Sequence, residues 1–179
     1  MIVTPDDMAK RTARFKNLSY SAQGYLDTRI PAHKRNTYNV IGRGVTEDKN
    51  LKPAILEAED FNITYIGAEP GCGAGLHDHP TVEVFIAMTE KWSIIWGKTG
   101  QHEIKIDQFD VVSVPPGVMR GFKNEGNSYG LIMAILGGSD SGNVIWENNV
   151  VEEAKKTGLR LNEDGTITCL LYTSDAADE

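Results

Sequence analysis

Short apolar segments separated by turns make up the middle of the chain. They are rich in the β-branched and aromatic residues that favour strands, and they lie at 61–68, 83–89, 92–96, 102–106, 110–114 and 129–136. Polar and apolar residues alternate at 102–106, as they do in a strand with one solvated face. Short strands at roughly ten-residue spacing predict an all-β sandwich or barrel, which we place at residues 53–147.

A further strand and a turn are predicted from weaker signals. Residues 38–45 carry a short strand signal, and the glycine-rich stretch Gly67–Gly75 is expected to break the chain into a turn. The segments at 83–89 and 92–96 are apolar on both faces, so one face is free to line the interior. The other face needs cover from the N-terminal extension or from a second copy of the chain. We therefore expect a homodimer.

The N-terminal region, residues 1–52, is expected to form a helix and an arm. Thr4 is a candidate N-cap, Pro5 suits the first helical position, and two aspartates follow it at the positive end of the helix dipole. We expect this helix to continue to about Asn17. The basic residues Arg29, His33, Lys34 and Arg35 lie close together around Pro31 and indicate an exposed loop or arm.

A second helix is predicted within residues 148–168. Asn148 or Asn149 is a candidate cap for a helix over 150–157, whose acidic residues come early and whose lysines come late. Gly158 stands where a C-terminal cap is expected. Residues 162–165, with the sequence NEDG, predict a turn.

The last residues, CLLYTSDAADE at 169–179, do not follow from the preceding pattern. They resemble the translated read-through of a transposon adapter from a sequencing library, a contaminant found at the ends of metagenomic genes. We expect this tail to be non-native and leave it out of the fold prediction. Without Cys169, Cys72 is the one native cysteine, and an internal disulfide is excluded.

Length and composition indicate one globular domain. The chain has 179 residues, of which 40% are hydrophobic and 24% charged, as in ordinary globular proteins. A formal net charge of −7 gives no electrostatic basis for binding nucleic acid. The apolar runs are too short to span a bilayer, and no secretory signal begins the chain. Together with the single cysteine, this favours a cytoplasmic protein.

Candidate metal ligands lie directly after the glycine-rich turn. His77 and His79 are two residues apart, which on a strand places both imidazoles on one face, and Glu83 opens the next predicted strand. Asp78, between the histidines, should point to the opposite face. Two imidazoles and one carboxylate are the ligand set of non-haem iron centres, and they also suit zinc, manganese, nickel or copper.

These residues belong to a longer pattern that resembles the cupin superfamily. The first cupin motif, G(X)5HXH(X)3,4E(X)6G, is matched at Gly71, His77, His79 and Glu83, and the second, G(X)5PXG(X)2H(X)3N, at Pro115, Gly117 and Asn124. The motif glycines that fall on Glu90 and Phe109 are missing, and Arg120 replaces the second-motif histidine. The resemblance covers about Phe61–Leu136. It implies a single jelly-roll β-barrel with one metal ion held inside by the histidines and the glutamate.

Arg120 leaves three arrangements open, because a guanidinium group has no lone pair to offer a metal. The metal stays on His77, His79 and Glu83, and Arg120 binds the carboxylate of a substrate through its two-pronged donor geometry. Alternatively, Arg120 pairs with Glu83 and leaves a metal-free site that binds a small anion. In the third arrangement, Arg120 swings out of the barrel and is only structural.

The resemblance implies a metal-dependent enzyme acting on a small organic acid. Dioxygenase-type oxidation is the expected chemistry, with iron on His77, His79 and Glu83 and with Arg120 as the catalytic residue that holds the substrate. Zinc, manganese or nickel would use the same ligands, and lyase or isomerase chemistry is an alternative. The rival is a metal-free module that binds a small anion. Cys72 and His102 are read as an incidental turn cysteine and a surface histidine.

Overall fold

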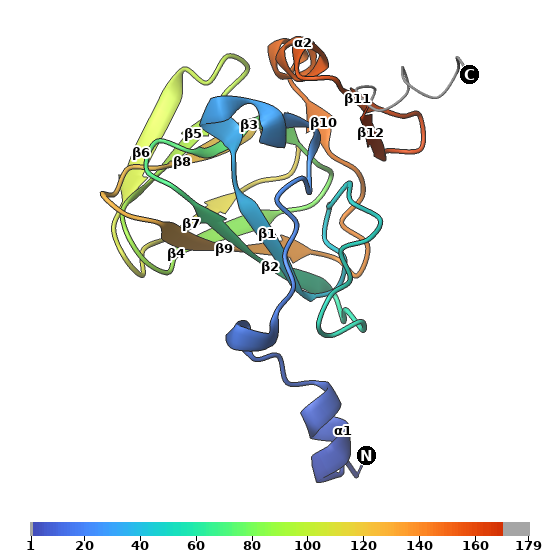
Figure 1. Cartoon of the computed structure of the whole chain (residues 1–179). Coiled ribbons are helices and arrows are strands. Elements are labelled where there is room, and N and C mark those ends of the chain that lie inside the picture. Colours follow the sequence, from blue (N-terminus) through green and yellow to red (C-terminus); the bar gives the residue numbers. More distant parts are fainter. Residues whose placement is uncertain (1, 170–179) are drawn as a thin grey trace, which may run out of the picture.

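Two five-stranded antiparallel sheets face each other in the computed structural model, which describes residues 2–169 (Figure 1). The first sheet has the strand order β1-β2-β9-β4-β7 and the second has the order β10-β3-β8-β5-β6. The predicted all-β jelly roll is confirmed. It is a sandwich of two sheets rather than a barrel closed by hydrogen bonds around its whole circumference.

The strands of the sandwich and of a separate hairpin have the following bounds: β1 Asn36–Ile41, β2 Phe61–Ala68, β3 Gly73–Asp78, β4 Glu83–Ala87, β5 Trp92–Trp96, β6 His102–Ile106, β7 Val111–Val114, β8 Arg120–Asn124, β9 Gly130–Gly137, β10 Ile145–Trp146, β11 Leu159–Leu161 and β12 Ile167–Cys169. The bounds predicted for β2, β5 and β6 are confirmed. The short strand expected at 38–45 is β1, which begins two residues earlier and pairs with β2. β1 ends at Ile41, before two glycines with positive φ, Gly42 and Gly44.

Two strands that the pattern did not predict, β3 and β8, lie side by side. A Cβ at Gly73 would overlap the Phe122 carbonyl, and a Cβ at Gly121 would lie 2.7 Å from the Ala74 carbonyl oxygen. These glycines therefore permit a close approach of two strands. The expectation that the whole stretch Gly67–Gly75 breaks the chain was wrong, because β3 begins at Gly73 and the turn is centred on Gly71, with φ of 77°.

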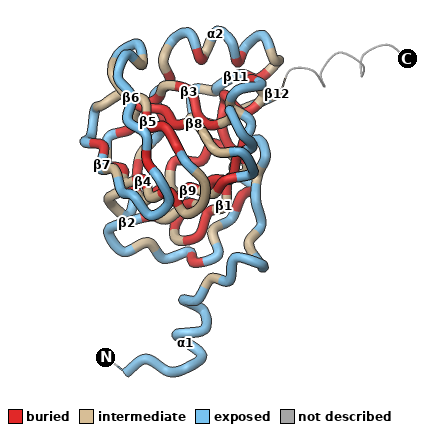
Figure 2. Tube along the Cα trace, turned by 90° about the vertical axis from the view of Figure 1, so that its left-hand side faces the viewer, coloured by how far each residue is buried: buried red, intermediate tan, exposed pale blue. Residues whose placement is uncertain are grey.

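The N-terminal helix is shorter than predicted. α1 covers Pro5–Lys10 and is capped by Thr4, whose side chain and that of Asp7 form a capping box. It buries no residue and stands away from the sandwich, as Figure 2 shows. A short helix without a buried face lacks the packing that stabilises most helices. The expected continuation to Asn17 is replaced by a separate 3₁₀ turn, η1, at Phe15–Asn17.

The C-terminal helix α2 covers Asn148–Lys156. Its N-cap is Glu147 rather than either predicted asparagine, because the Glu147 carboxylate accepts a hydrogen bond from the Asn149 amide. Gly158 has the positive φ of a helix terminus, and the predicted turn at 162–165 joins β11 to β12. Cys169 pairs with Leu159 in that hairpin, while residues 170–179 of the proposed adapter tail lie outside the described residues.

A segment of the N-terminal region, Gly24–Arg35, crosses the sandwich and is called the strap below. It contains two 3₁₀ turns, η2 at Leu26–Arg29 and η3 at Pro31–His33. Its residues Tyr25, Leu26 and Ile30 belong to the hydrophobic core. The core therefore extends beyond the two sheets. Among residues 2–169, no helix is long and apolar enough to cross a membrane.

Candidate metal centre

The three predicted ligands come together between the two sheets. His77 lies on β3 of the second sheet, Glu83 begins β4 of the first, and His79 lies in the connection between them. All three side chains are buried, and their ligand atoms lie within 4.8 Å of one another. Residues that are close in the sequence thus lie on two facing sheets, and their three ligand atoms lie close together between the sheets.

His77 is held in the form that a metal ligand requires. Its Nδ1 lies 2.8 Å from the Gly75 carbonyl oxygen, which only accepts, so Nδ1 carries the proton and Nε2 keeps its lone pair. Burial lowers the pKa of His77 to about 4, so the imidazole is neutral near pH 7. The ring packs on the Trp146 indole at a centroid distance of 5.3 Å.

His79 and Glu83 form a buried pair. His79 Nε2 lies 3.1 Å from Glu83 Oε2, and His79 Nδ1 lies 3.2 Å from the Thr81 hydroxyl oxygen. Burial acts to raise the pKa of Glu83, but the hydrogen bond with His79 and the surrounding positive charge outweigh it, and the pKa is lowered. Glu83 is therefore an ionised carboxylate. His79 Nε2 donates to Glu83, because a carboxylate only accepts, and Nδ1 accepts from Arg120 Nη2 at 3.5 Å. Binding of a metal to Nε2 would move the proton to Nδ1, where the Thr81 hydroxyl oxygen can accept a hydrogen bond.

Arg120 is fully buried beside these residues. It begins β8, pairs with His77 of β3 in the sheet, and donates from Nη1 to Asp78 Oδ1 at 2.7 Å. Its Nε lies 3.2 Å from Glu83 Oε2, a close ion pair, and this Nε makes no hydrogen bond with any residue of the described range 2–169. The arrangement in which Arg120 swings out of the fold is excluded.

Asp78 contacts the site instead of facing away from it as expected. Its carboxylate gives Arg120 the shortest of the guanidinium contacts. Arg120 therefore has two counter-ions, Asp78 at 2.7 Å and Glu83 at 3.2 Å, and two carboxylates balance its single charge. Two imidazoles and one carboxylate, with the nearby arginine paired to Asp78 and Glu83, fit a divalent metal ion.

The glycine positions that this chain lacks keep the backbone geometry of the motif. Glu90 has φ of 60° and Phe109 has φ of 72°, both in the left-handed region that favours glycine. At Glu90, the side chain accepts hydrogen bonds from the Asn127 amide and the Ser128 hydroxyl, which hold this conformation. At both positions, the residue differs from the motif glycine, but the backbone conformation is one that glycine favours.

A small inner cavity lies beside the candidate ligands. The space open to the centre of a water molecule is about 20 Å³, which is room for about one water. His77 and Glu83 line it, together with Thr64 and apolar residues of both sheets. Tyr25, Arg35 and Trp146 line it from outside the predicted motifs. Neither His79 nor Arg120 is among its lining residues.

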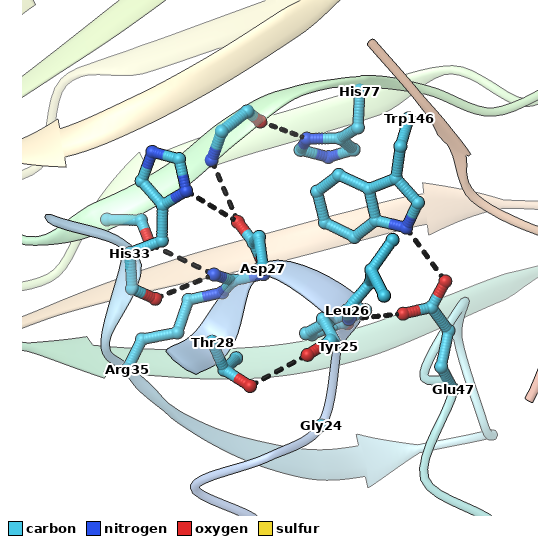
Figure 3. Close-up of polar contacts among 12 residues, drawn as sticks. Gly24, Tyr25, Leu26, Asp27, Thr28, His33, Arg35, Glu47, His77 and Trp146 are labelled. Carbon is cyan, nitrogen blue, oxygen red and sulfur yellow. Dashed lines mark hydrogen bonds and ion pairs between the residues drawn. The ribbon is translucent and has the colours of Figure 1, made fainter. Parts of the chain in front are cut away.

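The strap is fastened to β3, the strand that carries His77 (Figure 3). Asp27 Oδ2 accepts a hydrogen bond from the Gly75 amide at 2.9 Å, and Arg35 Nη1 donates to the Gly73 carbonyl at 3.0 Å. Asp27 and Arg35 also pair with each other at 2.8 Å, both fully or almost fully buried. The expected exposed position of Arg35 was wrong, because Asp27 neutralises its charge in the interior.

Four residues at this site escaped the sequence prediction: Tyr25, Arg35, Glu47 and Trp146. They are distant from the metal motif in the sequence, and no periodic pattern connects them to it. Trp146, a large apolar residue directly before the cap of α2, is the one local signal. Of the weaker candidates, His102 is exposed as expected and packs beside Trp96, and Cys72 contacts the Pro31 carbonyl, outside the three-ligand group.

Comparison with known proteins supports the assignment of the fold but identifies no related protein by sequence. No protein-family model matches the chain, and no curated protein sequence matches it. Among solved structures, the polyketide cyclase RemF from Streptomyces resistomycificus has a TM-score of 0.55 at 11% identity, over 75% of this chain and 82% of that protein. A cupin 2 domain-containing protein from Halorhodospira halophila has a TM-score of 0.51 at 17% identity, over 68% and 77%.

An oxalate oxidase also resembles the chain, with a TM-score of 0.53 at 13% identity, over 75% of this chain and 62% of that protein. Two facing sheets with a His-His-Glu group between them, together with these neighbours, show that the chain has the cupin fold. The chemistry differs among proteins with this fold, so the activity has to be argued from the site itself.

Proposed function

We propose that the protein is a metal-dependent cupin enzyme that acts on a small organic acid. The convergence of His77, His79 and Glu83 within 4.8 Å, beside an enclosed cavity, carries this proposal. Burial keeps His77 neutral and the local charges keep Glu83 ionised, which are the states that bind a metal. A surface cluster of the same residues would have neither property.

Iron is the metal we propose, and a dioxygenase-type oxidation is the reaction. Bound iron would supply the activation of dioxygen and a point of attachment for the substrate. Zinc, manganese or nickel would use the same donors and would support lyase or isomerase chemistry. One of the similar structures is an oxalate oxidase, and oxalate is a small organic acid, which supports the choice by analogy.

Other residues of the site orient the metal ligands or bind the substrate in this proposal. Gly75 fixes the orientation of His77, and Thr81 supports His79. Arg120 is a positioning residue for Glu83 in this proposal, because it contacts Glu83 and does not line the cavity. Arg35 does line the cavity, and its buried Nε has no hydrogen-bond partner among residues 2–169. We assign the substrate carboxylate to Arg35.

The metal content of protein purified without an affinity tag tests the proposal. We expect about one equivalent of a divalent metal per chain, or its uptake after anaerobic addition of iron or zinc. Protein that contains no stoichiometric metal and gains none would contradict a metal-dependent enzyme.

A metal-free module that binds a small anion is the second candidate. It is favoured by the 3.2 Å approach of Arg120 Nε to Glu83 Oε2, which can neutralise the carboxylate without a metal. Against it, Arg120 does not line the cavity, so an anion there would meet Arg35 and not Arg120. Calorimetric titration with oxalate before and after metal loading distinguishes the two, because only the enzyme is expected to bind oxalate more tightly once the metal is present.

A further inference from the structure

An outer pocket lies behind the inner cavity, on the side of the β11–β12 hairpin. Its volume is about 530 Å³, and its walls include Gln23, Lys49, Asn162 and Asp164. Glu47 is also one of its lining residues. The inner cavity, by contrast, is lined by Tyr25 and Trp146. Glu47 and Trp146 contact each other directly, so a residue that lines the outer pocket is hydrogen-bonded to one that lines the inner cavity.

The Glu47 carboxylate joins three parts of the chain at this point (Figure 3). One oxygen accepts a hydrogen bond from the Trp146 Nε1 at 2.8 Å, and the other accepts one from the Leu26 amide of the strap at 2.6 Å. The Glu47 amide donates to the Gly24 carbonyl at 2.9 Å. Glu47 makes no ion pair with any residue of the described range 2–169. Two hydrogen bonds to neutral donors hold its carboxylate in place.

Trp146 closes the inner cavity above His77. Its ring lies 5.3 Å from the His77 ring and 6.4 Å from the Tyr25 ring, measured between centroids. Its strand, β10, has two residues, and among residues 2–169 it pairs with β3 alone. A two-residue edge strand loses few backbone hydrogen bonds when it moves, so this part of the cavity wall can be displaced without breaking a sheet.

We infer that Trp146, held by Glu47, is a gate between the outer pocket and the inner cavity and limits the size of the molecules that reach His77. The route runs from the side of the β11–β12 hairpin. With the gate closed, the inner cavity has room for about one water. The identity of the site behind the gate rests on the proposed function, but access to His77 does not require a metal.

Modification of histidine by diethyl pyrocarbonate tests the gate without any enzyme assay. The reagent is much larger than water, and peptide mapping by mass spectrometry reports each histidine separately. The protein is first dialysed against a chelator so that no metal shields the imidazole. Exposed His102 is the internal standard. In the wild type, we expect His77 to react at least about tenfold more slowly than His102, because the gate excludes the reagent.

Substitutions on the two sides of the gate should open it. We expect Trp146→Ala and Glu47→Ala to accelerate modification of His77 at least about fivefold while His102 keeps its rate. Ile145→Ala is the matched control, because Ile145 is exposed on the same strand, and it should leave both rates unchanged. Circular dichroism verifies that each variant is folded, and Trp146→Phe, which lacks the Nε1 donor to Glu47, replaces any variant that is not.

An unchanged His77 rate in folded Trp146→Ala would overturn the inference, as would equal acceleration by Ile145→Ala. A failure of the proposed function has a different signature. In that case, the protein takes up no metal, while modification of His77 still responds to the gate variants.

Discussion

At the scale of single residues, Arg120 stands where the resemblance to cupins leads one to expect a histidine. The motif spacing located this position in the sequence, and the residue type showed that it is not a ligand. The partners of Arg120 could not be predicted, because Asp78 was assigned to the opposite face from strand alternation alone. The carboxylate of Asp78 reaches the guanidinium at the end of β3, where it is a counter-ion of Arg120 together with Glu83.

Arg120→His should strengthen metal binding. The substitution offers a fourth ligand and removes a buried cation, so we expect the affinity for zinc to rise at least about tenfold. Competition with a chelating dye measures the change. Arg11→His is the control, because Arg11 pairs only with exposed glutamates far from the site. Equal affinity of Arg120→His and wild type would mean that a side chain at position 120 does not reach the metal.

At the scale of elements, the sequence pattern predicts the bounds of those strands whose residues have large apolar side chains. The strands β2, β5 and β6 have the predicted bounds because β-branched and aromatic residues fill them. Strands β3 and β8 were not predicted because their glycines serve close strand packing, which the local sequence does not distinguish from a turn. The strap was read as exposed because the burial of Arg35 depends on its ion pair with Asp27 and on hydrogen bonds to two backbone carbonyl groups. These belong to His33 and Gly73.

The burial of Glu47 should make stability depend on pH. Burial, the largest cause, raises the pKa of Glu47 from 4.5 to about 7, with Asp27 and Arg35 as the neighbouring charges. Between these values, the folded protein binds a proton that the unfolded chain does not, so this contribution to stability falls as pH rises.

Glu47→Gln should remove that dependence. The free energy of unfolding of the wild type, relative to Glu47→Gln, should decrease by roughly 1–3 kcal/mol from about pH 5 to about pH 8. Urea denaturation at both values measures it, and Glu57→Gln, at an exposed position, is the control. A difference that stays constant or grows with pH would show that Glu47 is not protonated in the folded state.

At the scale of the whole molecule, the outer face of the first sheet is apolar. Ile63, Ile135 and Val84 form one row across β2, β9 and β4, and Tyr65, Met133 and Ile86 form the next. These side chains are partly exposed, and Phe15 of the arm covers only the Tyr65 end, at 5.9 Å between rings. We propose that a second copy of the chain covers the rest, because such a face normally carries polar residues in a monomer.

Sedimentation should therefore show a dimer. Met133→Lys places a charge in the centre of the apolar face, and we expect it to give a folded monomer, because burying an unpaired charge at an interface is costly. Lys105→Glu, at an exposed position on the other sheet, should leave the dimer intact. A wild-type protein that sediments as a monomer at all concentrations would rule out this assembly.

The central claim is that His77, His79 and Glu83 bind one divalent metal ion. The most direct test compares the metal content of the wild type with that of His77→Ala, His79→Ala and Glu83→Ala, measured by mass spectrometry on untagged protein. His102→Ala is the matched control, because it removes an exposed histidine outside the site. We predict about one equivalent in the wild type and in His102→Ala, and a loss of most of it in each of the other three. Retention of the metal in all three variants, or its absence from the wild type even after anaerobic addition of iron, would contradict the claim.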